Sequence, residues 1–295
     1  MIVQTLKNSV ARRDAAPWVL GVCLLIGAVG LLLHLGVAAR VSWQGVLFGL
    51  PLAILQAAVL VGLLRLSPLW RGVRPAHPSR LGWPTVAAAL LWGGGVAVVA
   101  APLLANPMKD LVSALGWVPL EASLAGAWPE EFLKGLGVVL ILLSVSHLCR
   151  PWQGLLMGAL IGLGFEVQEN LMYGYVEGLA HPDSDAVGMA ATWLMRVLGG
   201  PFLHACWTAL IGWGVGLALY GLRKDARRRA VQSAAWMCAG LALHLCWNLA
   251  ISNEAFAVVW MVLIAVLSYG AVLTVGWRQT RWLRAHRESI PQPVG

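Results

Sequence analysis

Long apolar runs separated by short polar segments dominate the chain. A bilayer core about 30 Å thick needs roughly 20 helical residues to cross it. Eight segments are long and apolar enough: Pro17–Val37, Trp43–Leu64, Pro84–Leu104, Pro129–His147, Trp152–Tyr175, Pro201–Tyr220, Val231–Ile251 and Ala255–Trp277. Tryptophan, which gathers at membrane interfaces, stands at the ends of several of them. The pattern predicts an all-α polytopic membrane protein with about eight transmembrane helices.

The composition agrees with a membrane protein. The 295 residues are 59% hydrophobic and only 12% charged, whereas an average soluble domain is about 25% charged. The net charge of +8 does not indicate nucleic-acid binding, because the basic residues gather in short loops and at the termini. The five cysteines lie in or beside apolar spans without a CxxC pair, so we expect free, buried thiols.

The distribution of basic residues predicts the topology. With the N-terminus in the cytoplasm, 17 of the 21 lysines and arginines fall on that side; Arg40, Lys109 and Arg196 fall outside, and Lys134 lies in a span. Cytoplasmic loops are enriched in Lys and Arg, so we expect both termini to be cytoplasmic. The segment 1–16 is basic and precedes an apolar run without a small-residue cleavage site, which favours a retained first span over a signal peptide.

Two longer segments between spans are expected on the outer side. Residues 105–127 contain a mildly amphipathic stretch, 108–117, and residues 178–195 begin acidic and become apolar. Gly199-Gly200-Pro201 should break any helix that continues from there. The predicted organisation is a cytoplasmic segment 1–16, three accessory spans and an outer loop in 17–128, a four-helix core in 129–252, a last span in 253–277 and a basic cytoplasmic tail in 278–295.

The polar residues inside spans gather in the fourth to seventh spans. Ionisable groups cost roughly 2.5–3.5 kcal/mol each at a bilayer centre, so such residues need an explanation. The strongest are Glu130, Glu131 and Lys134; Glu166, Glu169 and Asn170; His204 and Thr208; and His244 and Asn248. Their spacings of three and four place the members of each group on one helix face.

The depths of these residues also agree. Counted from the cytoplasmic ends at 1.5 Å per residue, Glu131, Glu166, His204 and His244 all lie about 20–24 Å into the membrane. Glu130 and Glu131 alone could be a favourable charge at a helix N-terminus with Lys134 as partner. The common depth on four helices of alternating direction predicts instead one polar site in the outer third of the membrane.

Carboxylates and imidazoles in a wet cavity suit hydrolysis. A carboxylate can act as general base on a water molecule, and His or Asn can stabilise a developing oxyanion. All five aspartates lie in loops or termini, which argues against a membrane aspartyl dyad. The chain contains neither an HExxH zinc motif nor a GxSxG nucleophile elbow.

The four polar groups resemble the motifs of a known family. Glu130-Glu131-x-x-Lys134, Phe165-x-x-x-Glu169-Asn170, His204-x-x-x-Thr208 and His244-x-x-Trp247-Asn248 occur in this order over residues 129–250. They resemble the PrsW family of intramembrane proteases and, more distantly, the CAAX-protease and bacteriocin-processing superfamily. The superfamily has FxxxH where this chain has Phe165-x-x-x-Glu169, so the role of Glu169 stays open.

The resemblance implies a glutamate-dependent endopeptidase that cuts membrane-anchored proteins, such as an anti-sigma factor, near the outer face of a bacterial inner membrane. Glu130 or Glu131 would be the general base. His204, His244 and Asn248 would hold water or the oxyanion, Glu166 and Glu169 would stand in or next to the site, and Lys134, Asn170 and Thr208 would support it.

Three alternatives remain from the sequence. We expect no metal, but zinc held by Glu131, Glu166, His204 and His244 is the alternative, because glutamate and histidine are zinc ligands. Intramembrane carboxylates also occur in ion- or proton-coupled transporters, whose sites lie nearer the midplane between repeats. A non-catalytic membrane scaffold would tolerate replacement of all the polar residues.

Overall fold

A computed structural model of the chain describes residues 10–72, 82–221 and 225–285, with side chains given from residue 15 onward and not for 71–72. The described residues form helices and no strand. They are α2 (Val10–Val41), α3 (Trp43–Leu66), α4 (Pro68–Gly72), α5 (Trp83–Leu91), the π-helix η1 (Trp92–Ala97), α6 (Val98–Ala114), the 3₁₀ turn η2 (Val118–Leu120), the π-helix η3 (Ala122–Ala127), α7 (Trp128–Ser144), α8 (Pro151–Ala180), α9 (Asp185–Gly199), α10 (Leu203–Tyr220), α11 (Ala226–Trp247) and α12 (Glu254–Ala285).

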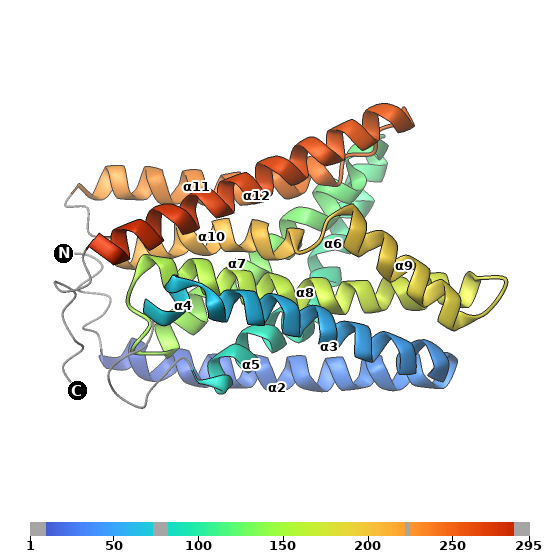
Figure 1. Cartoon of the computed structure of the whole chain (residues 1–295), viewed down its shortest axis with the longest axis horizontal. Helices are drawn as coiled ribbons and strands as arrows, with labels where there is room; N and C mark the ends of the chain where they lie inside the picture. The colour runs from blue at the N-terminus through green and yellow to red at the C-terminus, as the bar shows by residue number, and fades with distance from the viewer. Residues whose placement is uncertain (1–9, 73–81, 222–224, 286–295) are drawn as a thin grey trace.

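The helix α8 lies at the centre of the bundle. Every residue from Trp152 to Glu166 is buried, and α3, α5, η1, α7, α9 and α10 all pack against it. Figure 1 shows the long helices running side by side, with α2 and α3 along one edge and α11 and α12 along the other. A helical segment that is apolar and covered on all sides is a core element. The packing of residues 152–165 of α8 therefore fixes the position of the polar residues that follow in the same helix.

A glycine stripe sets the distance between α8 and α10. A Cβ atom at Gly154, Gly158 or Gly162 would lie well inside van der Waals contact with backbone oxygens of α10, at Gly212, Thr208 and His204 respectively. Small residues at a four-residue spacing let two membrane helices approach closely. The stripe thus holds α10, with His204 and Thr208, directly against α8.

The third apolar segment approaches α8 through glycine as well. Cβ atoms at Gly93 and Gly94 in η1 would collide with backbone atoms of α8. Trp92, at the start of η1, donates from its indole Nε1 to the carbonyl of Leu133 in α7 at 2.9 Å. A π-helical turn inside a longer helix often marks a functional region, and this turn packs beside the two helices that carry the glutamates.

Six helices are long and apolar enough to cross a membrane among the described residues: Ala15–Val41, Trp43–Leu66, Trp83–Ala114, Leu203–Tyr220, Ala226–Trp247 and Glu254–Ala285. They match six of the eight predicted spans and make this an integral membrane protein. The other two predicted spans are α7, which has only 17 residues, and α8. The helix α8 is continuous, but its apolar sequence is interrupted by Glu166, Gln168, Glu169 and Asn170.

Several element boundaries differ from the prediction. The third span runs to Ala114, so the first part of the expected outer loop is helix. The outer segment after α8 contains a full helix, α9, which ends at Gly199 as the Gly-Gly-Pro predicts. The last helix continues to Ala285, into the predicted tail. All five cysteines are free, as expected, but none is fully buried, and Cys238 is exposed.

Part of the topology prediction concerns residues outside the described ranges. These residues are Lys7, Arg74, Arg80, Arg223, Lys224 and Arg287. Residues 1–9 of the predicted N-terminal segment and 286–295 of the predicted tail also lie outside the described ranges. Within the described residues, α2 begins and α12 ends at the same end of the bundle (Figure 1).

Candidate active site

Glu131 is a fully enclosed carboxylate at the start of α7. Its side chain is 1% exposed, and its Oε1 lies 2.6 Å from the Lys134 ammonium. The same oxygen accepts from Nδ1 of His244 at 3.0 Å, and Oε2 accepts from the Thr208 hydroxyl at 2.9 Å. One carboxylate thus joins α7, α10 and α11, and its oxygens are already engaged by three partners.

Glu130 is held more loosely. Its side chain is 14% exposed, and its Oε2 lies 3.5 Å from the Lys134 ammonium, 3.8 Å from Nε2 of His244 and 3.9 Å from Nδ1 of His204. None of these distances is that of a strong charged hydrogen bond. Of the two neighbouring glutamates, Glu130 is the accessible one.

Both histidines are oriented by carboxylates. His244 uses Nδ1 towards Glu131, and His204 uses Nε2 towards Oε2 of Glu169 at 2.9 Å. An ionised carboxylate only accepts, so these ring nitrogens carry the protons. The lone pairs on the other nitrogens, Nε2 of His244 and Nδ1 of His204, therefore face Glu130.

The ring nitrogens that face Glu130 also have donors nearby. The Lys134 ammonium lies 3.1 Å from Nδ1 of His204, and the Asn248 amide lies 3.4 Å from Nε2 of His244. Asn248 follows the last helical residue of α11 and also donates to the carbonyl of Ala122 at 3.3 Å. Asn248 therefore stands at the rim of the site with an amide group aimed at it.

Glu166 supports the backbone at the start of α10. It accepts from the backbone N–H of Phe202 at 2.7 Å and of His204 at 3.2 Å. Phe202 has a φ of 62°, a left-handed conformation that costs a bulky L-residue about 1–2 kcal/mol. Strained backbone of this kind concentrates at functional sites, and here it turns the chain so that His204 enters the site.

A second polar layer joins α3, α8 and α9. Gln56 of α3 donates to Glu166 at 2.8 Å and accepts from the Asn170 amide at 3.0 Å. Arg196 of α9 pairs with Oε2 of Glu169 at 2.5 Å and also hydrogen-bonds Asn170. Buried polar groups of this kind are stable only when each finds a partner, and these contacts provide a partner for each of the five side chains.

Aromatic rings hold the histidines from the other side. Trp207 stacks on His244 with ring centroids 4.1 Å apart and 16° between the planes. Its indole donates to Ser268 of α12 at 2.9 Å. The two histidine rings meet edge to face at 4.7 Å. The ring positions are therefore fixed by packing as well as by hydrogen bonds.

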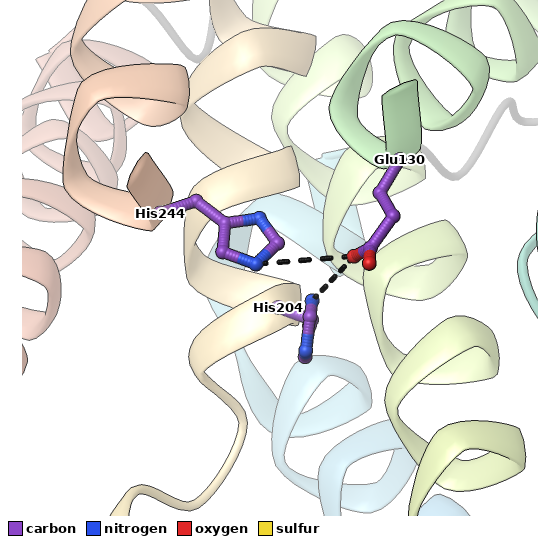
Figure 2. A group of neighbouring side chains, drawn as sticks. All are labelled: Glu130, His204 and His244. Carbon is purple, nitrogen blue, oxygen red and sulfur yellow. Dashed lines mark ion pairs between the residues drawn. The ribbon is translucent and has the colours of Figure 1, made fainter. Parts of the chain in front are cut away.

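Glu130, His204 and His244 form a group with the geometry to hold a metal ion. One ligand atom from each lies within 4.8 Å of the others, and Figure 2 shows the three side chains converging from α7, α10 and α11. Two imidazoles and one carboxylate are also the ligands of one class of catalytic zinc site. Of the four residues expected as alternative zinc ligands, the two histidines belong to this group, whereas Glu131 and Glu166 lie outside it.

The structure brings all the predicted site residues together. Glu130, Glu131, Lys134, Glu169, His204, Thr208, His244 and Asn248 form one connected cluster, and Glu166 with Asn170 lies directly behind it. Sequence reasoning missed Gln56 and Arg196. Gln56 is a polar residue in the middle of a mostly apolar span, which is a usable signal. The sequence indicates Arg196 only as a positive charge on the outer side of the membrane.

A comparison with known families identifies the chain. The profile described as "PrsW family intramembrane metalloprotease" matches residues 82–273, about two thirds of the chain. The chain belongs to the PrsW family. The resemblance found from the four motifs is thus confirmed, and family membership supports an intramembrane protease and does not favour a transporter. Neither a curated protein nor a solved structure matches the chain.

The match to the PrsW family changes two expectations. It extends from the third span to the eighth, beyond the residues 129–250 that carry the motifs, so both flanking spans belong to the family's common part. The family description also names a metalloprotease. That wording, together with the Glu130, His204 and His244 group, favours a metal over the metal-free expectation.

Proposed function

We propose that this PrsW-family protein hydrolyses peptide bonds of membrane-anchored proteins at a centre formed by Glu130, His204 and His244, and that this centre holds zinc. The observation that carries the proposal is the convergence of the three side chains within 4.8 Å (Figure 2). Catalytic zinc sites commonly use three protein ligands and leave a further position open. Glu130 is the partly exposed member of the group.

The surroundings of the histidines fit a metal ion. Metal-binding histidines usually donate their other ring N–H to a carboxylate or carbonyl, which fixes the tautomer. His244 has Glu131 and His204 has Glu169 in this position. We propose these two carboxylates as orienting groups and Glu130, His204 and His244 as the zinc ligands.

Bound zinc would lower the pKa of a water molecule to near 7 and polarise the scissile carbonyl. The protein's own residues supply the rest of the chemistry. Asn248 donates a hydrogen bond to the oxyanion that develops on the carbonyl oxygen. Lys134, buried against Glu131, keeps a positive charge beside the reacting atoms. Thr208 and His244 hold Glu131 in place, so that it orients His244. The proton of the attacking water would pass to solvent, and the amine released from the cleaved peptide bond would take up a proton from water.

A metal-free mechanism is the second candidate, because one contact favours it. The Lys134 ammonium lies 3.1 Å from Nδ1 of His204, the nitrogen that zinc would use. In this mechanism Glu130 takes a proton from water as general base and returns it to the leaving amine nitrogen. His244 positions that water by accepting a hydrogen bond at Nε2, and Asn248 stabilises the oxyanion.

Metal analysis and activity together test both candidates. We expect the purified protein to contain about one zinc per chain, to lose cleavage of a membrane-anchored substrate on chelation, and to regain it with added zinc. Glu130→Gln should lower kcat/KM by about 10²–10⁴-fold if Glu130 is the general base, and should lower the zinc content as well if Glu130 is a zinc ligand. Glu121→Gln, at a partly exposed outer position, is the matched control.

Each result has a defined meaning. Full activity of a metal-free preparation that Glu130→Gln abolishes would replace the zinc proposal with the general-base mechanism. Wild-type rates in a well-expressed Glu130→Gln variant would overturn both candidates.

We further propose the membrane arrangement and the setting. The six apolar helices together with α7 and α8 make eight spans with both termini in the cytoplasm, which is supported by the excess of basic residues in the intervening loops. The site then opens near the outer face of a bacterial inner membrane, where it would cut a membrane-anchored protein such as an anti-sigma factor.

A further inference from the structure

A pocket of about 240 Å³ borders the active site on the side of His204. Its polar lining is formed by Glu166, Asn170, Arg196 and His204. These side chains are engaged with one another or with Gln56, Glu169, Lys134 and the backbone N–H groups of Phe202 and His204. Drug-sized ligands occupy about 300–1,000 Å³, so this pocket suits one side chain with its adjoining backbone.

The rest of the pocket lining is apolar. It consists of Met195 of α9, Leu203 and Trp207 of α10, Trp247 of α11 and Met261 of α12, together with Gly199 and Gly200. A charged side chain would lose its hydration here without gaining a partner, which is costly. An aliphatic or aromatic side chain fits these walls.

The mouth of the pocket faces the membrane between α9 and α12. Met195 is 74% exposed and Met261 is 38% exposed, and both lie on helices whose outward residues are apolar, including Leu198 and Val262. The helix α9 packs on α8 and α3, with Met189 and Trp193 buried on that face. One pocket thus includes both the exposed Met195 and Met261 and the buried His204.

We propose that a membrane-anchored substrate approaches laterally between α9 and α12, and that the pocket binds one apolar side chain of that substrate next to the cleaved bond. The inference rests on the proposed protease function and adds the route and the side-chain class. His204 belongs both to the pocket wall and to the catalytic group. Residues of an extended chain are about 3.3 Å apart, so the bound side chain lies within about two positions of the cleaved peptide.

Substrate selectivity tests the pocket. Mass spectrometry first locates the cleavage site in a membrane-anchored model substrate, and each residue within two positions is then changed to Ala, Leu, Phe or Asp. We expect one position at which Leu or Phe exceeds Asp in kcat/KM by at least tenfold. Met261→Trp, which narrows the pocket, should lower kcat/KM for Leu and Phe about tenfold relative to Ala, the range for small changes in an apolar pocket.

The neighbouring Val262 provides the matched control. It is 58% exposed on the same helix and is not part of the pocket, so Val262→Trp should leave the Leu-to-Ala ratio unchanged. Equal losses for all substrates in Met261→Trp, or the same change in ratio in Val262→Trp, would overturn the proposed pocket.

Photo-crosslinking tests the route without requiring turnover. A benzophenone amino acid is placed at Met195 or Met261 in the Glu130→Gln variant, and at Leu273 of α12 as a lipid-facing control. We expect crosslinks to the model substrate at the first two positions and at least tenfold fewer at Leu273. Cleavage by the wild type without these crosslinks would overturn the lateral route alone. Crosslinks to a segment that the wild type never cuts would instead count against the protease.

Discussion

At the scale of single residues, the positive charge of Lys134 explains how two neighbouring glutamates, Glu130 and Glu131, can lie together in one buried site. Its side chain is fully buried and lies between Glu131 at 2.6 Å, His204 at 3.1 Å and Glu130 at 3.5 Å. An unpaired buried charge costs several kcal/mol, whereas a pair with good geometry and further hydrogen bonds offsets much of that penalty. The EExxK spacing thus places a compensating cation one turn below the two glutamates.

Arg196 is predicted to position Glu169, and through it His204. We expect Arg196→Met to lower kcat/KM by about 10–100-fold, the effect typical of losing a partner behind an active-site ligand. Arg196→Lys should recover part of the loss, because the ammonium restores the charge but not the second hydrogen bond to Asn170. The measurement is steady-state cleavage together with zinc content per chain.

The control for this prediction is Lys109→Met. Lys109 pairs with Glu121 at 3.2 Å but is 60% exposed, and exposed pairs contribute little. Equal activities of the Arg196→Met and Lys109→Met variants would remove Arg196 from the site.

At the scale of elements, the contact between α8 and α10 determines whether the histidine face meets the glutamate face. Gly158 stands where a Cβ would press on the backbone oxygen of Thr208. We expect Gly158→Ala to push the helices apart, to destabilise the protein by about 1–3 kcal/mol as overpacking does, and to lower cleavage at least tenfold. Thermal unfolding in detergent and cleavage rate measure the two effects.

The matched variant Gly62→Ala should act in the opposite direction. Gly62 lies within α3, and a Cβ there would meet nothing within 4 Å. Alanine is the better helix former by roughly 0.5–1 kcal/mol, so this change should preserve or raise the unfolding midpoint. A Gly158→Ala protein as stable as the wild type would show that the close approach is dispensable.

The helices could largely be predicted because their signal is local. All eight predicted segments contain helix, and six are confirmed as long apolar spans. The ends were less accurate: residues 105–114 extend the third predicted span, and residues 278–285 extend the last one. Helices that continue beyond an apolar core carry mixed sequences there, so hydropathy alone does not mark where they stop.

The site could be predicted as far as its members lie on polar faces of apolar helices. Helical spacing and common depth brought Glu131, Glu166, His204 and His244 into one layer, and all four take part in the observed hydrogen-bond network. The partner of each residue was not predictable, because it depends on how helices rotate against one another. The sequence therefore connects neither Gln56, although it is polar within a span, nor Arg196, which it indicates only as a charge outside the spans, to the other site residues.

At the scale of the whole molecule, the distribution of basic residues among the loops predicts that the site opens towards the outer face of the membrane. In a protein without its natural cysteines, we expect Lys109→Cys and Asp183→Cys to react with a membrane-impermeant maleimide in intact cells. Arg284→Cys should react only after the cells are opened. Lys109 and Asp183 are 60% and 76% exposed, so accessibility does not limit their labelling. Labelling of Arg284→Cys in intact cells would contradict the topology.

One oxygen atom connects the substrate route to the chemistry. Oε2 of Glu169 accepts both from Arg196, on α9, and from His204. A displacement of α9 would therefore move the carboxylate that orients the imidazole of His204, one of the proposed zinc ligands. A membrane segment that displaces α9 without binding in the pocket would therefore leave His204 misoriented, and it would not be cleaved. The protein would then bind many neighbouring membrane proteins weakly and cut few of them. Its selectivity would lie in the rate of cleavage and not in the affinity for the substrate.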